Sequence, residues 1–436
     1  GNGGEFGGSV GTTGDVDGDG VPDLLVGARS EAGPLGSGQG RVVLVSGATG
    51  GTLAEWRGTN PWAYFGATVA GAGDLDGDGT PDLLIGEPGN NGNGGLNGAV
   101  HALSGANGAT LHQFQGGSRE KVGGAVANAG DVDADGTPDI VFGVPVRSSI
   151  ALYAGAVEIR SGRTGALIYE IPGWQDQDLM GSAVAAAGDW NGDGFADVAM
   201  SAPIAFGTGV VIVVSGADGR NLAWLRGLSA SDAFGQRLAA AGDVDADGVP
   251  DLLVGAPSAG LGHEGAVAVI SGRTQLNLAV HHGSKTQSFF GVSLASLGDL
   301  DGDGHAEYAL GAPREDGLEA AAGAVHAWSC GELELLAPTP GLAGMDNLLA
   351  AHGASPGALV YFVWGMRTGR TPVPGCPGVV LDLGDPRLAG TAAADSMGVA
   401  RLIATVPAAA AGHAVLLQAV EIQTYRASRL LAHHWR

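Results

Sequence analysis

The sequence predicts an all-β protein built from six similar units and followed by a smaller β domain. Three observations lead to this prediction. A nine-residue aspartate-rich motif recurs at intervals of 59, 57, 58, 54 and 56 residues, beginning at Asp15, Asp74, Asp131, Asp189, Asp243 and Asp299. Each interval contains short strand-like runs separated by turn residues. The chain has 80 glycines among 436 residues and only 6% aromatic residues, which suits short strands and tight turns. A period this regular indicates an array of equivalent structural units.

Each unit is expected to hold four antiparallel strands. The first strand is opened by an FG-like pair: Phe6-Gly7, Phe65-Gly66, Val122-Gly123, Met180-Gly181, Phe234-Gly235 or Phe290-Gly291. The second strand follows the aspartate-rich motif and ends in Gly-Ala-Pro or a variant, as in Gly255-Ala-Pro257. In the first unit, the third strand lies within residues 40–47 and the fourth within residues 52–58. Four short antiparallel strands per unit describe a blade of a β-propeller.

The aspartate-rich motif has the chemistry of a metal loop. Positions 1, 3 and 5 carry carboxylates in every copy except for Asn191, and position 6 is always glycine, which tolerates the positive φ of a tight loop. Carboxylates this close repel one another unless a cation lies among them, and all-oxygen ligation suits Ca²⁺ better than zinc or copper. We therefore expect up to six Ca²⁺ ions.

In each loop the expected ligands are the side chains at positions 1, 3, 5 and 9 and the backbone carbonyl at position 7. The thirty predicted metal residues are Asp15, Asp17, Asp19, Val21, Asp23, Asp74, Asp76, Asp78, Thr80, Asp82, Asp131, Asp133, Asp135, Thr137, Asp139, Asp189, Asn191, Asp193, Phe195, Asp197, Asp243, Asp245, Asp247, Val249, Asp251, Asp299, Asp301, Asp303, His305 and Glu307. An EF-hand would require glutamate at position 12, but every copy is apolar there, so that interpretation fails. A single copy could be simple turn sequence, whereas six copies in register favour metal binding.

The alternation of FG, DxDxDGxxD and GAP resembles the FG-GAP repeats of the integrin α-subunit β-propeller and its bacterial relatives. The resemblance covers residues 5 to about 337. It implies that the Ca²⁺ loops join the first and second strands of each blade and that partners bind the opposite, upper face. Integrin propellers have seven blades, and only some of them carry Ca²⁺ loops. Here six units are present and all have loops, so a six-bladed ring is expected and seven blades stay open.

The repeat ends near residue 338, and a different domain is expected after it. We predict a Ca²⁺-binding propeller over residues 1–337 and a small β-sandwich-like domain over residues 338–436. Strands are expected over residues 358–364, 379–383, 400–405 and 413–423. The two cysteines, Cys330 and Cys376, permit one disulfide between these domains or two free thiols. We also expect the second domain to pack on a propeller, its own or a neighbour's.

Charge and composition narrow the functional class. The formal net charge is −24, and 23 of the 45 acidic residues lie in the six loops, so acidity mainly reflects metal-site chemistry. With Lys121 and Lys285 as its only lysines, the chain has no basic footprint for nucleic acid. No apolar run has the length of a membrane span, and no signal peptide appears in this sequence. Extracellular Ca²⁺ would fill even modest sites, so an extracellular or cell-surface location is expected.

Outside the loops, few residues invite a functional interpretation. The exposed aromatics Trp62, Tyr64 and Trp174 fall between blades on the predicted upper face, where they could bind a glycan or protein or plug blade junctions. His281 occupies a packed position in a fourth strand, and His282 an exposed one. No nucleophile or phosphate-binding motif is found, and no catalytic residue is predicted. The sequence thus favours a secreted, non-enzymatic adhesion or structural scaffold. A lectin and a self-assembling subunit of a filament or surface layer are the alternatives.

Overall fold

The structure is a computed structural model of the chain. It describes residues 4–89, 95–227, 229, 232–300, 302, 304–315, 323–328 and, further on, strand segments within residues 334–434. Two compact units are distinguished: residues 1–297 with 308–327, and residues 298–307 with 328–436. The predicted domain boundary at residues 337 and 338 falls outside the described residues, as do Cys330 and Cys376.

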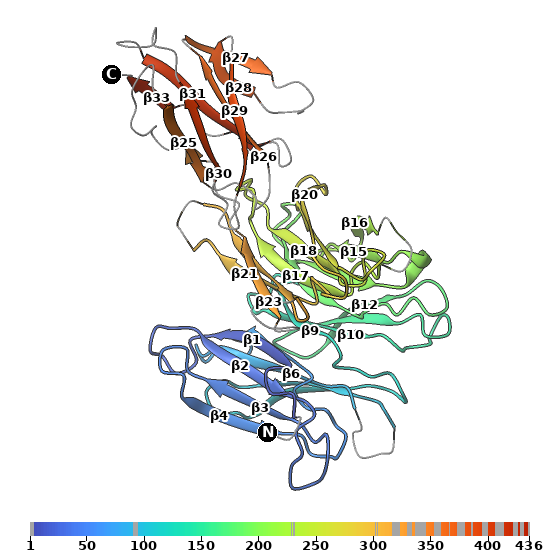
Figure 1. Cartoon of the computed structure of the whole chain (residues 1–436). Coiled ribbons are helices and arrows are strands. Elements are labelled where there is room, and N and C mark those ends of the chain that lie inside the picture. The colour runs from blue at the N-terminus through green and yellow to red at the C-terminus, as the bar shows by residue number, and fades with distance from the viewer. Residues whose placement is uncertain are drawn as a thin grey trace. The chain divides into compact units, whose positions relative to one another are not determined.

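Six antiparallel sheets form the blades of a β-propeller, which confirms the predicted fold class (Figure 1). In every blade the strands follow one another across the sheet in chain order. Five blades have four strands each, and three strands of the sixth are described. The chain therefore forms six blades rather than the seven that the sequence left open.

The strand bounds repeat closely from blade to blade. They are β1 (Ser9–Gly14), β2 (Asp23–Ala28), β3 (Arg41–Val45) and β4 (Thr52–Arg57); β5 (Thr68–Gly73), β6 (Asp82–Glu87), β7 (Ala99–Leu103) and β8 (Thr110–Gln115); β9 (Val126–Gly130), β10 (Asp139–Val144), β11 (Ala156–Arg160) and β12 (Leu167–Pro172); β13 (Val184–Gly188), β14 (Asp197–Ala202), β15 (Val210–Val214) and β16 (Asn221–Arg226); β17 (Arg237–Gly242), β18 (Asp251–Ala256), β19 (Ala266–Ile270) and β20 (Asn277–His282); and β21 (Ser293–Gly298), β22 (Glu307–Ala312) and β23 (Ala324–Trp328). A 3-10 turn, η1 (Ala205–Gly207), follows β14.

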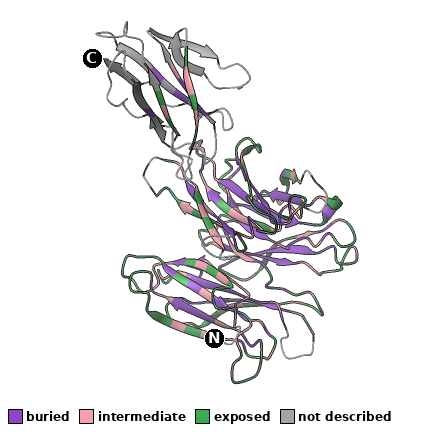
Figure 2. Cartoon of the chain, in the orientation of Figure 1, coloured by how far each residue is buried: buried purple, intermediate pink, exposed green. Residues whose placement is uncertain are grey.

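The hydrophobic core lies between neighbouring blades. Every residue of the second strands β6, β10, β14 and β18 is buried, whereas the outer strands β4, β8 and β12 contain only exposed and half-buried residues (Figure 2). A second strand covered on both faces needs a continuous apolar run, while an outer strand needs apolar residues on one face only. One apolar cluster, for example, joins Leu84 and Val100 of the second blade to Phe142 of the third.

The FG and GAP glycines allow adjacent blades to approach closely. A Cβ atom added to Gly86, in the GAP-like segment of the second blade, would lie 2.1 Å from the carbonyl oxygen of Gly123, in the FG-like pair of the third. The same approach joins Gly27 to Gly66 at 2.2 Å and Gly143 to Gly181 at 1.8 Å. No side chain fits in that space, so the two repeated glycines are a packing requirement of the blade junction.

The first strands of all six blades surround a central cavity of about 730 Å³. Its wall includes small residues, such as Ala125, Ala183 and Ser293, that lie in the inner strands or directly before them. Small side chains on the inner strands are expected, because these strands converge toward the axis of the propeller.

The C-terminal residues add further strands: β24 (Glu334–Leu335), β25 (Asp346–His352), β26 (Leu359–Gly365), β27 (Arg367–Pro372), β28 (Val380–Gly384), β29 (Arg387–Ala393), β30 (Ala400–Thr405), β31 (Ala414–Glu421), β32 (Arg426–Ala427) and β33 (Leu431–His434). In this part β26 pairs with β29 and β31, while β25 pairs with β24 and β30. All four strands predicted beyond residue 338 are present, as β26, β28, β30 and β31. That they form a β-sandwich stays a prediction.

Candidate metal centre

Each aspartate-rich loop joins the first strand of its blade to the second strand. In the first blade it runs from Asp15 to Asp23, and Asp23 is also the first residue of β2. The strand register shifts between Thr12 and Gly14, where β1 ends, and Gly14 has φ of +90°. This left-handed conformation suits glycine and turns the chain out of the sheet into the loop. The six loops therefore occupy equivalent places in their blades.

The position-1 aspartate organises the loop backbone. Asp15 Oδ1 accepts hydrogen bonds from the backbone N–H groups of Gly18, at 2.8 Å, and Asp19, at 3.0 Å. Its Oδ2 accepts from Gly20 N–H at 2.7 Å. Three bonds to one carboxylate wind the loop around it, in the manner of the Asx turns that aspartate favours. The bond from position 6 to position 1 is found in all six loops.

The glycine at position 6 meets a conformational requirement rather than a steric one. Gly20, Gly79 and Gly136 have φ of +89°, +88° and +86°, and a Cβ added to any of them would meet no atom within 4 Å. An L-amino acid side chain is strained at such φ values even in open space. The conformation places the N–H of position 6 toward the position-1 carboxylate.

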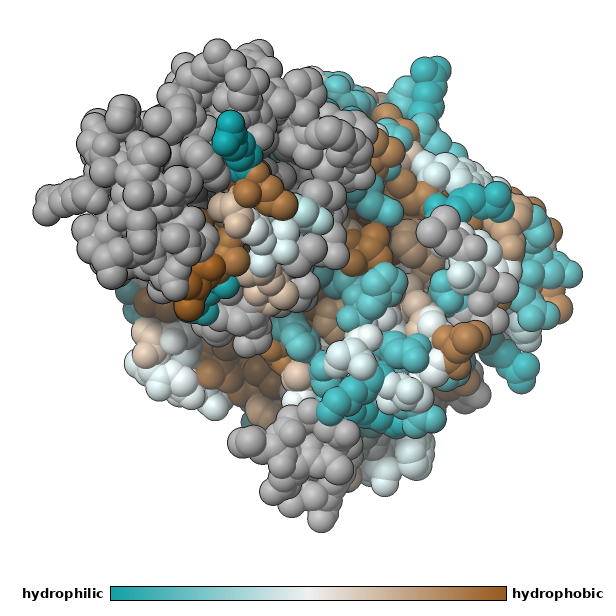
Figure 3. Space-filling view, turned by 45° about the horizontal axis from the view of Figure 1, so that its top comes forward, coloured by the Kyte–Doolittle hydropathy of each residue, from teal (hydrophilic) through white to brown (hydrophobic). Residues whose placement is uncertain are grey.

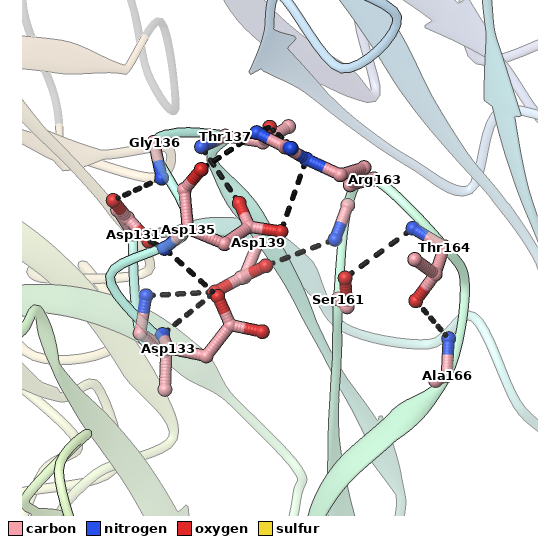
Figure 4. A network of polar contacts seen from close by, with 12 residues as sticks. Asp131, Asp133, Asp135, Gly136, Thr137, Asp139, Ser161, Arg163, Thr164 and Ala166 are labelled. Carbon is pink, nitrogen blue, oxygen red and sulfur yellow. Dashed lines mark hydrogen bonds and ion pairs between the residues drawn. The ribbon is translucent and has the colours of Figure 1, made fainter.

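In four of the six loops, three of the predicted acidic ligands lie close together. Carboxylate oxygens lie within 4.8 Å of one another at Asp15, Asp17 and Asp19; at Asp74, Asp76 and Asp78; at Asp131, Asp133 and Asp139; and at Asp243, Asp245 and Asp251. In the third loop the acidic residues gather on one turn of the chain (Figure 4). The pKa of Asp133 is raised, first by burial and then by the neighbouring carboxylates of Asp135 and Asp131.

Position 9 holds a buried carboxylate with a structural role. Asp139 is fully buried, its Oδ2 accepts the N–H of Val132 at 2.7 Å, and its Oδ1 accepts the N–H of Gly162 at 2.9 Å. Gly162 lies in the turn between β11 and β12, so Asp139 ties the metal loop to that turn. Burial raises the pKa of Asp139 to about 6 and that of Asp251 to about 7, and nearby carboxylates act in the same direction.

The fourth and sixth loops differ from the rest. In the fourth, Asn191 Nδ2 donates to Asp193 Oδ2 at 2.8 Å, so the amide occupies an oxygen that a cation could use. In the sixth, Glu307 Oε2 accepts the N–H of Leu300 at 2.6 Å, while its buried Oε1 has no hydrogen-bond partner in the described part of the chain. Asp301 and Asp303 lie outside the described residues.

These residues fit Ca²⁺. The donors are carboxylate oxygens, with no thiolate or imidazole among the clustered side chains, and hard oxygen ligands are those that Ca²⁺ prefers. The raised pKa values of Asp133 and Asp139 show that their negative charge is poorly stabilised by the protein alone. A cation would stabilise this charge, and it would also give the buried Glu307 Oε1 a partner. A bound Ca²⁺ would supply that countercharge. Ligation by position 9 and by the position-7 carbonyls remains a prediction.

Two arginines that the sequence interpretation missed also reach the loops. Arg163 Nε lies 3.1 Å from Asp135 Oδ2, and Arg273 Nε lies 3.1 Å from Asp247 Oδ2 (Figure 4 for the first pair). Both arginines come from the turn between the third and fourth strands of their blades. A comparison of the repeats could have found them, because the same turn has Ala48, Ala106 and Ala217 in the first, second and fourth blades.

Comparison with protein families agrees with the repeat pattern. Residues 234–270 and 290–328 match the FG-GAP repeat, and residues 15–85 match the FG-GAP-like repeat. This chain is an FG-GAP repeat protein. The matched segments include the first two, the fifth and the sixth aspartate-rich loops, and they confirm the resemblance on which the fold prediction relied.

This FG-GAP repeat protein is distantly homologous to integrin α subunits. It is 33% identical over 222 residues to integrin alpha pat-2 of Caenorhabditis briggsae, and this alignment covers 43% of this chain and 18% of the integrin subunit. It is 33% identical over 202 residues to integrin alpha-V of Gallus gallus, and the alignment covers 42% of this chain and 19% of that subunit. It is 30% identical over 213 residues to integrin alpha-8 of Homo sapiens, and the alignment covers 44% of this chain and 20% of that subunit. The similarity thus spans about a fifth of each relative's length.

An aromatic cluster lies apart from the metal loops of this FG-GAP repeat protein. The rings of Trp174 and Trp224 have centroids 4.6 Å apart, and Phe206 lies 6.3 and 6.2 Å from them. The Arg226 guanidinium lies over the Phe206 ring at 4.6 Å. Trp224 and Phe206 are 41% and 42% exposed. The sequence singled out Trp174, in the link between the third and fourth blades, but missed Phe206 and Trp224 of the fourth blade, which are distant from it in sequence.

The other predicted residues are placed as follows. Trp62 is 54% exposed and contacts Tyr64 edge-on, with ring centroids 6.4 Å apart. His281 is half-buried and bonded to the Tyr308 hydroxyl at 2.8 Å, whereas His282 is exposed. The packed and exposed positions predicted for these two histidines are confirmed. In the described residues, no helix is long and apolar enough to cross a membrane.

Proposed function

We propose that this FG-GAP repeat protein is an extracellular, Ca²⁺-binding interaction scaffold that binds a protein or glycan partner and catalyses no reaction. The observation that carries the proposal is the convergence of carboxylates in repeated loops of a propeller. Each loop connects two strands of one blade, so Ca²⁺ bound there would stabilise a rigid platform. We propose Ca²⁺ at all six loops, including the fourth and the sixth.

The extracellular location is supported by the metal chemistry and by the relatives. FG-GAP propellers of the integrin type are typically extracellular, and the chain matches integrin α subunits in several animals. Exposed loops such as Asp15 to Asp23 have partly solvated ligands, and modest sites of this kind are filled at extracellular Ca²⁺ concentrations. A cytosolic concentration would leave them empty.

The partner would bind the upper face, defined here as the end of the blades opposite the aspartate-rich loops. That end carries the loops between second and third strands and the links between blades, where length and composition vary most. Variable loops on a rigid ring are suited to recognition. In the view of Figure 3, apolar and hydrophilic residues are interspersed over the described surface.

Calorimetric titration of the Ca²⁺-free chain tests the metal part of the proposal. We expect several Ca²⁺ ions per chain to bind, with Mg²⁺ giving a much weaker response because it requires near-ideal octahedral geometry. The Asp15→Asn/Asp17→Asn variant should lose one of these sites. An absence of Ca²⁺ binding at millimolar concentration would refute the scaffold proposal.

A lectin is the second candidate, and the aromatic cluster favours it. Trp174, Phe206 and Trp224 present partly exposed rings beside the Arg226 guanidinium. Aromatic faces stack on sugar rings, and a neighbouring cation can bind hydroxyl or carboxylate groups. A glycan array compared with the Trp224→Ala variant distinguishes the candidates. Binding that this substitution abolishes would identify a lectin, whereas an unresponsive array leaves the protein-binding scaffold.

A self-assembling subunit is the third candidate from the sequence. It relied on packing of residues 338–436 against a propeller, and much of that segment lies outside the described residues. Negative-stain microscopy with and without Ca²⁺ tests it. Regular filaments or sheets of the chain would favour this candidate over the partner-binding scaffold.

A further inference from the structure

The six metal loops fall into two types according to sequence. The third and fifth loops have alanine at position 4, Ala134 and Ala246, where the other four have glycine. The same two blades have arginine after the Ser-Gly of the turn between strands three and four, at Arg163 and Arg273. Both changes thus occur together, twice, in one chain.

The arginine and position 5 of the loop are bound to each other. In the third loop, Arg163 Nε lies 3.1 Å from Asp135 Oδ2, and Nη2 donates to the Asp135 carbonyl oxygen at 2.6 Å. Arg163 Nη2 also donates to Thr137 Oγ1 at 3.0 Å. In the fifth loop, Arg273 makes the same two contacts with the Asp247 carboxylate and carbonyl. Each guanidinium therefore contacts position 5, a predicted metal ligand, and that of Arg163 also reaches position 7.

These contacts occupy the oxygen that a cation would need. The other oxygen of the position-5 carboxylate, Oδ1, already accepts the N–H of position 7, at 2.9 Å in the third loop and 2.9 Å in the fifth. Oδ2 is the oxygen without a backbone hydrogen bond, and the guanidinium lies against it, so Ca²⁺ would have to compete at both oxygens of this carboxylate. In the first and second loops the corresponding Asp19 and Asp78 have no cationic partner among the described residues.

The grouping of carboxylates changes accordingly. In the first and second loops the clustered carboxylates are those of positions 1, 3 and 5. In the third and fifth loops they are those of positions 1, 3 and 9, and the position-5 carboxylate is missing from the group. The buried aspartates Asp139 and Asp251 take its place.

The loop backbone differs as well. Position-4 N–H donates to the position-1 carboxylate in the loops that have glycine there, at 2.8 Å in the first and 2.7 Å in the second. Among the described hydrogen bonds, Ala134 and Ala246 make no such contact. Their φ values are +56° and +55°, compared with +78° for Gly18 and Gly77. The arginine-bearing loops thus have a distinct conformation.

We propose that Arg163 and Arg273 are built-in countercharges that make the third and fifth loops a weaker class of Ca²⁺ site than the first and second. This inference rests on the proposed Ca²⁺ binding. In each such loop Ca²⁺ must displace the guanidinium from the position-5 oxygen or bind beside its positive charge. When Ca²⁺ is scarce, the guanidinium pairs with one of the four carboxylates in each of these two loops, whereas the position-5 carboxylates of the first and second loops keep no such countercharge among the described residues.

The size of the effect follows from electrostatics. A unit charge about 6 Å from a divalent ion in water-like surroundings changes the affinity on the order of tenfold. Arg163 and Arg273 are each 56% exposed, so water-like screening is appropriate and their truncation removes little packing. We therefore expect a difference of about tenfold in dissociation constant between the two classes.

Calorimetric Ca²⁺ titration of the full chain tests the proposal with three proteins. The unmodified chain should show at least a tight and a weak phase. In the Arg163→Ala/Arg273→Ala variant two sites of the weak phase should tighten by about tenfold. In the Ala106→Arg variant, which carries the arginine into the second blade, one tight site should weaken by a similar factor.

The outcomes of this titration distinguish a failure of the two-class inference from a failure of the proposed Ca²⁺ binding. If the double variant has an unchanged weak phase, the inference is wrong even though Ca²⁺ binds. If the unmodified chain does not bind Ca²⁺, the proposed function fails first. Circular dichroism checks folding, and Arg163→Gln/Arg273→Gln, which keeps hydrogen-bonding capacity without charge, should show the same tightening. Crystals equilibrated at graded Ca²⁺ would give site-resolved occupancy, with equal filling of the first and third loops contradicting the proposal.

Discussion

Asp23 Oδ1 accepts the backbone N–H of Gly47 at 3.0 Å, and this bond ties the beginning of β2 to the turn between β3 and β4. The equivalent bond recurs in the next four blades, at 2.9 to 3.0 Å. The last aspartate of each of the first five motifs is therefore a structural residue of the blade as well as a predicted metal ligand. Its two contacts suggest a direct stability test.

Replacing the position-9 aspartate should destabilise the propeller even without metal. Asp139→Ala would leave the N–H groups of Val132 and Gly162 buried without their acceptor. We expect a loss of about 2 to 5 kcal/mol in the free energy of unfolding, because each such buried group costs about 1 to 3 kcal/mol. Denaturant unfolding in chelator measures this loss. The exposed Asp218→Ala serves as the control, with a change below about 1 kcal/mol, and an equal effect of both substitutions would contradict the role given to Asp139.

Gly86→Ala should separate the second and third blades. The added methyl group would lie 2.1 Å from the Gly123 carbonyl oxygen and 2.2 Å from Thr68 Oγ1, so one backbone must move. We expect a loss of about 3 kcal/mol in unfolding free energy, as for overpacked core sites. Gly124→Ala is the matched control, since its Cβ would meet only one atom, at 3.7 Å. Similar melting temperatures for both variants would show that the close approach is not required.

Removal of Ca²⁺ should lower the melting temperature. Ca²⁺ that binds only to the folded chain stabilises it by about 2.7 kcal/mol per site at a hundredfold excess over the dissociation constant. Differential scanning calorimetry measures the change between about 2 mM Ca²⁺, which is in the extracellular range, and EGTA, which removes Ca²⁺. Addition of Mg²⁺ to the chelated sample should restore little stability. Identical melting curves with Ca²⁺ and with EGTA would reject a structural role of the metal.

His281 should make stability depend on pH. Burial lowers the pKa of His281 to about 4, and its Nε2 is bonded to the buried Tyr308 hydroxyl. Because the unfolded histidine has its ordinary pKa near 6.5, the unfolded state binds more protons between these values. Stability from this residue is thus complete above about pH 6.5 and declines as pH falls toward 4, by about 2 kcal/mol at pH 5.

The His281→Gln variant isolates this contribution. Glutamine keeps a hydrogen-bonding group toward Tyr308 but does not titrate. The loss of unfolding free energy between pH 7.5 and 5 should be about 2 kcal/mol smaller in the variant than in the unmodified chain. Both proteins are compared in EGTA, so that acid release of Ca²⁺ does not contribute. Equal losses would mean that His281 is not kept neutral by the fold.

Much of the fold and of the candidate site could be predicted from local sequence. The six motifs, the FG and GAP pairs and the strand runs repeat at a fixed period, and each blade is built from residues close in sequence. Positive φ at Gly20 and the winding of the loop around Asp15 are likewise local, because all partners lie within a few residues. The pattern was therefore sufficient to predict the four-stranded blade and the clustered carboxylates, whereas it left six and seven blades open.

Only the tertiary structure decided which distant residues complete each loop. Asp135 and Arg163 are 28 positions apart, and Asp23 and Gly47 are 24 apart, so their contacts depend on the antiparallel pairing of strands between them. The same holds between blades, where Gly86 meets Gly123, and at the link after the third blade, where Trp174 meets Trp224. The sequence by itself determined the repeated blade and its carboxylate-rich loop, because these arise from local turns and strand patterns. The tertiary structure decided which loops carry a guanidinium and which aromatic rings meet, because those contacts form only when strands and blades pack together.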